Sequence, residues 1–144
     1  MERRTMGNWD EQAESIMAER FGKDAVIAMA TVDNGKPYVR FVNAYYEDGS
    51  FYTITYASSN KIKHIEKDPI AAIAGEWFTA HGIGCNLGYF GNQENAAIAE
   101  KLRIAFSDWI DNGHNDFSDK NTIILQVKLT DAVLLSHGTR YDFA

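Results

Sequence analysis

The sequence has little cysteine, little proline and a shortage of positive charge. Among its 144 residues are 1 Cys and 2 Pro, so no disulfide can form within the chain, which fits a reducing compartment. The 20 acidic residues outnumber the 14 basic ones, and the net charge of −6 argues against nucleic acid as a main partner. No run approaches 18 apolar residues, so we expect no membrane span.

The remaining composition is that of an ordinary soluble globular protein, with 45% hydrophobic and 24% charged residues. The length predicts a single domain over residues 1–144 that buries roughly 68–70% of the surface of its unfolded chain. Met1 to Thr5 is basic, but no apolar segment follows it. A secretory signal is therefore not expected, and we expect a cytoplasmic protein.

Two segments have the apolar periodicity of amphipathic helices, residues 8–21 and residues 92–110. For the first of them, Asn8 is the predicted N-cap, and Glu11 would complete a capping box. Gly22 follows as the expected stop.

Short apolar segments separated by turn signals predict antiparallel strands. Asn34-Gly35 and Asp48-Gly49 are strong hairpin turns, because these residues tolerate positive φ. About six strands with helices inserted between them suggest a small closed or half-closed barrel. The predicted strands are residues 25–32, 36–46, 51–56, 70–77 and 81–90, with residues 122–129 and 132–135 as the last strand material.

Residues 48–67 are the most informative part of the chain. They predict a turn, a strand, a polar turn and a short helix over residues 59–67, which ends where Asp68-Pro69 disfavours helical backbone. Thr55, Ser59 and Lys61 place two hydroxyls and a cation where this helix begins. A helix N-terminus offers unpaired N–H groups and a partial positive charge, so we expect a phosphorylated ligand there.

Arg40 lies in the middle of the predicted strand 36–46, and its role is open to two interpretations. Charged residues are mostly exposed, so Arg40 can point to solvent or pair with a surface carboxylate. Alternatively, its guanidinium can grip a phosphate. Because strands 36–46 and 51–56 should pair across the Asp48-Gly49 turn, Arg40 and the end of the second strand could converge.

Residues 25–77 resemble the pyridoxamine 5′-phosphate oxidase-like family of FMN-binding split barrels, in particular its general stress protein branch. The matching segments are PYVRFV, DGSFYTIT, SNK and the helix that leads to Asp68-Pro69. A strand Thr55 followed by Ser59 and Lys61 is the phosphate signature of that family. The resemblance implies a mainly β fold: a six-stranded antiparallel split β-barrel with an N-terminal helix, a short phosphate-site helix and a longer helix before the last strand.

The resemblance also implies a set of cofactor-binding residues, namely Arg40, Val42, Asn43, Thr53, Thr55, Ser59 and Lys61. Arg40, Ser59 and Lys61 would bind the phosphate of FMN, and the other four would line its ribityl chain or its isoalloxazine ring. Family members are homodimers with flavin at the subunit interface, and a small barrel filled by its own side chains has no room for a flavin inside. Trp77 could form part of that interface cleft, although a Trp at a strand end is also commonly core or dimer packing.

The leading functional hypothesis is an FMN-dependent oxidoreductase that acts on an unidentified small molecule, with the flavin carrying the electrons. A protein that stores or senses flavin, or binds haem, and a deazaflavin-dependent reductase are the alternatives, because fold does not fix function. The sequence assigns no catalytic residue, and His81 is a weak candidate acid or base. Residues 136–144 lack a basic segment for a second phosphate, so oxidation of pyridoxine phosphate is not predicted.

Other residues give weaker signals. Gly82, Gly84 and Gly88 do not have the spacing of a dinucleotide fingerprint and instead predict a bulge or bend, or a close approach to flavin or a second subunit. No metal site is predicted: along a strand, His81 and Cys85 lie roughly 13 Å apart. No ligand spacing is found either among the remaining histidines, His64, His114 and His137.

Overall fold

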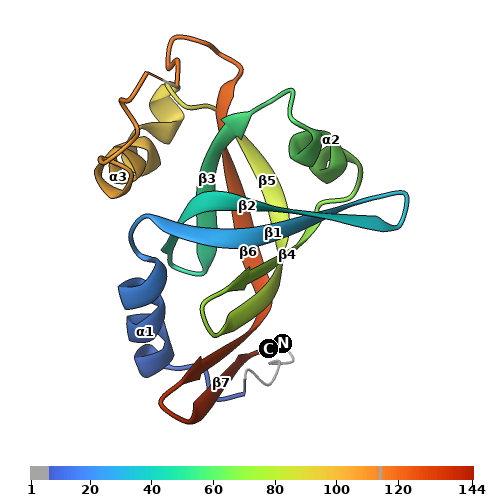
Figure 1. Ribbon diagram of the computed structural model, residues 1–144, viewed down its shortest axis with the longest axis vertical. Helices are drawn as coiled ribbons and strands as arrows, with labels where there is room; N and C mark the ends of the chain where they lie inside the picture. The colour runs from blue at the N-terminus through green and yellow to red at the C-terminus, as the bar shows by residue number, and fades with distance from the viewer. Residues whose placement is uncertain (1–6, 114) are drawn as a thin grey trace.

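The protein is described by a computed structural model that covers residues 7–113 and 115–144. Its strands form one sheet in the order β3-β2-β1-β4-β5-β6-β7, and a pairing of β3 with β6 closes the first six into a barrel (Figure 1). All neighbouring strands are antiparallel, so the mainly β, six-stranded split barrel predicted from the sequence is confirmed. The strands are β1 Ala25–Asp33, β2 Lys36–Glu47, β3 Ser50–Tyr56, β4 Ile70–Gly75, β5 Phe78–Tyr89, β6 Thr122–Ser136 and β7 Thr139–Phe143.

Tight turns connect the first three strands as predicted. Asn34 and Gly35 have φ values of 54° and 77°, and Asp48 and Gly49 have values of 48° and 82°. Two consecutive residues at positive φ match the right-handed twist of the flanking strands. The predictions for Met1 to Thr5 and for His114 concern residues outside the described ranges.

The described residues also form three α-helices and a short 3-10 helix outside the barrel: α1 Glu11–Phe21, α2 Asn60–Lys67, η1 Gln93–Asn95 and α3 Ala96–Ala105. The helix predicted over residues 92–110 is therefore too long. Its apolar stripe continues past the end of α3, where Phe106 and Ile110 are buried in turns. Apolar periodicity reports which side chains are buried, and turns can preserve it after the helical hydrogen bonds end. None of the helices in the described part of the chain is long and apolar enough to cross a membrane.

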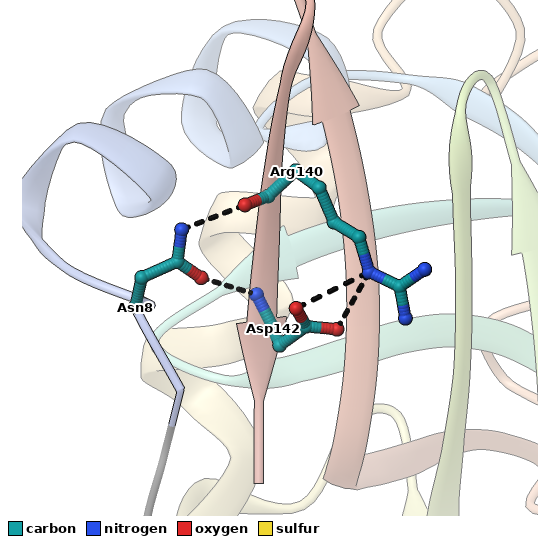
Figure 2. A network of polar contacts seen from close by, with 3 residues as sticks. All are labelled: Asn8, Arg140 and Asp142. Carbon is teal, nitrogen blue, oxygen red and sulfur yellow. Dashed lines mark hydrogen bonds and ion pairs between the residues drawn. The ribbon is translucent and has the colours of Figure 1, made fainter.

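Asn8 is not the N-cap of α1, contrary to the sequence prediction. Asp10 takes that place, and its carboxylate accepts the N–H of Ala13 at 3.0 Å. Asn8 instead bonds the edge of β7: its Nδ2 donates to the carbonyl of Arg140 at 2.7 Å, and its Oδ1 accepts the N–H of Asp142 at 2.8 Å (Figure 2). An Asn side chain carries a donor and an acceptor, so it can satisfy a strand edge as a neighbouring strand would.

The C-terminal half of the sheet differs from the prediction at its ends. The strand predicted over residues 70–77 ends at Gly75, and the next begins at Phe78 rather than His81. β7 was not predicted; a turn at His137-Gly138 leads into it. The glycine bends in β5 are confirmed, because its register with β6 shifts between His81 and Gly82 and again between Asn86 and Tyr89.

Two clusters of buried apolar side chains hold the helices against the barrel. The larger one fills the barrel, and α1 and α2 pack onto it from opposite sides, with Met17 and Ile62 fully buried (Figure 1). The smaller one lies between α3 and the outer face of β3 and β6, around Leu102 and Phe106. Burying a large aliphatic or aromatic side chain contributes about 1.5–3 kcal/mol. These contacts are therefore the main ones that fix α1, α2 and α3 to the barrel.

We expect Tyr46→Phe to destabilise the fold by about 1–3 kcal/mol. The buried Tyr46 hydroxyl donates to Glu14 Oε1 of α1 at 2.8 Å and accepts the Gly49 N–H at 3.0 Å. Burial, first, and Glu14, second, raise the pKa of Tyr46 far above its ordinary value, so the hydroxyl remains a donor. Urea unfolding would measure the loss. Tyr141→Phe is the control, because no described residue bonds the Tyr141 hydroxyl; an equal loss in both variants would contradict the assignment.

Candidate functional site

The barrel is split between β2 and β3. These strands pair only near their shared turn, at Tyr45 to Glu47 with Ser50 to Tyr52. Beyond it β2 pairs with β1, whereas residues 53–56 of β3 pair with β6. The facing edges, residues 36–44 and residues 53–56, therefore make no ladder with each other. We call this gap the split; the Thr53 hydroxyl bridges its closed end by donating to the Asn43 carbonyl at 2.7 Å.

Arg40 lies on the β2 side of the split and is partly buried. Its Nη1 donates to the carbonyls of Met29 and Tyr38, each at 3.2 Å, and to Thr31 Oγ1 at 2.9 Å. Burial lowers the pKa of Arg40 from its ordinary value. Among the described residues no carboxylate pairs with Arg40 and no acceptor meets its Nε or Nη2. Pairing with a surface carboxylate is therefore not found among the described residues, and one edge of the guanidinium is accessible to solvent or to a ligand.

Lys61 supplies a second cation from the first turn of α2. Its Nζ donates to Thr55 Oγ1 at 2.7 Å, which ties the helix to the end of β3. Burial, first, and the nearby Arg40 charge, second, lower the pKa of Lys61. No ion pair joins Lys61 to any described acidic residue. Two cations that repel one another and have no carboxylate between them form an arrangement that an anion would stabilise.

The N-terminus of α2 adds backbone donors to this site. Ser59 is the N-cap residue, but its side chain makes no capping hydrogen bond. Among the residues that the structure describes, its hydroxyl has one long contact, of 3.5 Å from Thr55 Oγ1. The first N–H groups of the eight-residue helix α2 are thus free of a side-chain cap and point toward the end at which Lys61 lies. Such a helix end favours an anion.

The structure therefore brings Arg40, Thr55, Ser59 and Lys61 together, but not every predicted residue joins them. Val42 packs against the barrel core. The Asn43 amide donates to Asp24 Oδ1 at 2.9 Å, and Thr53 is buried with its hydroxyl engaged. These three lie along the split, and their side chains make contacts within the chain.

Trp77 lies apart from this cluster. It is in the turn between β4 and β5, with φ of 53° and 68% of its surface exposed. α2 leads into the start of β4, and Trp77 follows the opposite end of this six-residue strand, roughly 17 Å away along its length. Trp77 there lines a groove with α1 and the β6–β7 turn. Within one chain it does not contribute to the Arg40 and Lys61 site.

Sequence reasoning missed two members of the site, Thr31 and His64. Thr31 is fully buried on β1, and its Oγ1 lies 2.9 Å from Arg40 Nη1 and 2.8 Å from His64 Nδ1. His64 follows Lys61 by one turn of α2, which is the spacing that could have indicated a shared face. No signal in the sequence marked Thr31, because a single Thr inside an apolar strand is ordinary.

His81, the candidate acid or base, pairs with Asp131 on the outside of the sheet. Its Nδ1 lies 2.9 Å from Asp131 Oδ1, and both side chains are substantially exposed. It is not among the contacts of Arg40 or Lys61. Cys85 is exposed on the same strand. Across residues 7–113 and 115–144 no three His, Cys, Asp or Glu side chains gather as metal ligands.

The fold and the site define a class of protein: a split antiparallel barrel with two cations, Arg40 and Lys61, near the start of a short helix. Several solved structures share the fold. General stress protein 26 from Bacillus anthracis is 18% identical, covering 84% of this chain and 92% of its own, with a TM-score of 0.63. A nimc/nima family protein from Clostridium acetobutylicum is 18% identical over 92% and 94%, with a TM-score of 0.65. An FAD-binding protein from Mesorhizobium loti is 16% identical over 82% and 90%, with a TM-score of 0.60.

The sequence model of the pyridoxamine 5′-phosphate oxidase family matches residues 14–131. The match includes every residue of the site described above, and the chain belongs to this family. No curated protein sequence matches the chain.

Proposed function

We propose that the protein binds FMN, anchors the phosphate of the cofactor at Arg40 and Lys61, and uses the flavin to oxidise or reduce a small molecule. The observation that carries the proposal is the pair of partly buried cations without a carboxylate partner beside the uncapped start of α2. The family match and the FAD-binding relative support a flavin over other phosphorylated ligands.

The residues present fit a phosphate monoester. The Nε and Nη2 edge of Arg40 suits two phosphate oxygens, because a guanidinium presents its donors as a planar fork. Lys61 adds a point charge, and the N–H groups at the start of α2 add neutral donors. The Ser59 hydroxyl can donate to a third oxygen. Burial, first, and repulsion by Arg40, second, lower the pKa of Lys61, and a dianionic phosphate would offset both.

The split is proposed to receive the rest of the cofactor. The backbone edges of residues 40–44 and 53–56 keep donors and acceptors that no strand uses, and a flavin ring has both along its polar edge. The chain's own residues thus bind the phosphate, orient the ring and exclude water on one side. When bound, FMN would supply the transfer of hydride or single electrons, and the protein would supply position and electrostatics.

A second copy of the chain is proposed to cover the other side. Three large apolar side chains are exposed close together on the outer face of β1 and β2: Val26 at 62%, Val39 at 71% and Phe41 at 79%. Phe41 pairs in register with Ala28, and Val39 pairs with Ala30, so the apolar surface is continuous across both strands. Such a patch on a soluble protein marks an interaction surface, and it borders the split.

FMN titration of dialysed protein, with riboflavin as the comparison, tests the proposal. We expect tight binding of FMN and much weaker binding of riboflavin, both measured by quenching of the flavin fluorescence. Arg40→Ala combined with Lys61→Ala should weaken FMN binding by about 100-fold or more, because hydrogen bonds to charged groups contribute roughly 1.5–3 kcal/mol each. Lys63→Ala on the exposed face of α2 is the control. Equal binding of both flavins would refute a phosphate-anchored site.

Reduction of bound flavin by a donor such as NADPH separates an enzyme from a flavin-storing or flavin-sensing protein. Flavin that binds tightly but is reduced by no donor would favour the latter. If the protein bound a deazaflavin or haem more tightly than FMN in the same titration, that molecule would be the ligand instead of FMN. The proposed anion site would still stand.

We expect FMN affinity to fall as the pH rises. The fall should begin below pH 10.5, the ordinary pKa of lysine, because the pKa of Lys61 is lowered in the free protein. Phosphate favours charged Lys61, so binding raises this pKa. Affinity should be constant below the free-protein pKa and fall as pH rises through it. Dissociation constants measured from neutral to alkaline pH would show this. In Lys61→Arg, which stays charged, the fall should disappear; its persistence would exclude Lys61 as the cause.

Phe41→Lys should convert a dimer into a monomer and weaken FMN binding in parallel. A charge buried against a second copy carries a large desolvation cost, and the ligand would lose the cover of the partner. Light scattering during size-exclusion chromatography would measure the mass. Ile104→Lys on α3 is the control, because Ile104 is also 68% exposed but lies on another face. A wild-type protein that is monomeric with FMN bound would contradict the proposal.

A further inference from the structure

The buried hydroxyl of Thr31 joins the two elements that carry the proposed phosphate site. Thr31 is 0% exposed, on the inner face of β1. Its Oγ1 meets Arg40 Nη1 of β2 at 2.9 Å and His64 Nδ1 of α2 at 2.8 Å. Arg40 and Lys61 therefore belong to one connected structure: β2 is linked through Thr31 to the helix that also presents Lys61.

The chemistry of the three groups gives this chain of hydrogen bonds a direction. An arginine can only donate, so Thr31 Oγ1 accepts from Arg40. The hydroxyl has one hydrogen of its own, and His64 Nδ1 is the acceptor at hydrogen-bonding distance. If the hydroxyl donates to His64, Nδ1 carries no hydrogen and Nε2 carries the hydrogen of the ring. Because a hydroxyl oxygen has two lone pairs, the opposite tautomer, in which Nδ1 donates to Oγ1, is the alternative that a measurement must exclude. Tyr38 packs against that ring at 5.0 Å between centroids, which fixes the plane of the imidazole.

The same contacts fix the orientation of the guanidinium. All three protein acceptors of Arg40 converge on Nη1, and two of them are backbone carbonyls, of Met29 and Tyr38. Thr31 is the one side chain in this set. With Nη1 anchored, Nε and Nη2 meet no acceptor among the described residues. A partly buried arginine held this way loses little further side-chain entropy when an anion binds.

We propose that Thr31 and His64 are positioning residues for Arg40, and that their hydrogen-bonded chain sets the preference of the site for a phosphorylated flavin over an unphosphorylated one. The proposal rests on the function proposed above and names two residues that do not touch the ligand. Their effect is expected on the phosphate alone, because the chain ends at the Arg40 guanidinium and includes no residue of the β3 edge of the split.

Thr31→Val tests this with the ratio of riboflavin to FMN dissociation constants as the readout. Valine keeps the β-branched shape and removes both hydrogen bonds. We expect the preference for FMN to fall by about 10-fold or more, with riboflavin affinity unchanged and Thr31→Ser restoring the preference. Thr122→Val is the matched control: Thr122 is also buried, at 1% exposed, and its hydroxyl donates to the Asp116 carbonyl at 3.0 Å, away from the site.

A purely structural role for Thr31 would lower the melting temperature but leave the ratio intact, and that result in a folded Thr31→Val would overturn the proposal. A second measurement needs no variant and no flavin. Long-range ¹H–¹⁵N NMR of the wild-type protein should show His64 with an unprotonated Nδ1 and a protonated Nε2. A hydrogen on Nδ1 near neutral pH would reverse the Thr31–His64 hydrogen bond and refute the direction assigned to the chain. If wild-type protein does not prefer FMN over riboflavin, the proposed function fails, and the His64 tautomer still tests the assigned direction.

Discussion

The separation of β2 from β3 is the constraint on which the rest of this structure depends. Had β3 continued to pair with β2 beyond Tyr52, the ladder would have closed and the backbone groups of both edges would have been consumed. β3 turns instead to β6 over the whole of residues 50–56, and β2 follows β1 out to the Asn34-Gly35 turn. The barrel is closed by β3 and β6, and the split remains as an edge that a ligand or a partner can occupy without costing the core any packing.

The site beside the split is electrostatically unfavourable when empty, and the surrounding fold holds it in place. Arg40 and Lys61 repel one another and are partly desolvated. α2 nevertheless stays docked, because Ile62 and Ile65 are buried in the barrel core on the same helix that carries Lys61. Apolar packing of one helix face thus fixes a cation on the other. Binding sites commonly store such unfavourable arrangements, which a complementary ligand relieves.

Much of this could be predicted from sequence, because the determining signals are local. The Asn34-Gly35 and Asp48-Gly49 turns were predicted, as was the start of α2, since glycine, proline and capping chemistry act within a few residues. The failures concern partners distant in sequence. Asn8 is a residue type that favours the N-cap position, but its amide instead donates a hydrogen bond to β7, more than 130 residues away in the sequence. Thr31 and His64 meet Arg40 only through the packing of β1, β2 and α2, and no spacing rule connects three such elements.

The geometry of the site also explains why its class is easier to assign than its reaction. The groups proposed to meet the ligand are suited to binding: a guanidinium edge, an ammonium, a hydroxyl and helix N–H groups can recognise a phosphate but do not move a proton at neutral pH. His81, the exposed imidazole paired with Asp131, lies on the outer face of β5, apart from the Arg40 and Lys61 contacts. On one chain the proposed site therefore has groups suited to a cofactor phosphate and no identified group for a substrate. If the second copy proposed above covers the apolar surface around Phe41, it would supply the remaining wall of the proposed site. The choice of small molecule would then depend on the shape and charge of two chains together, because the fold alone does not fix it.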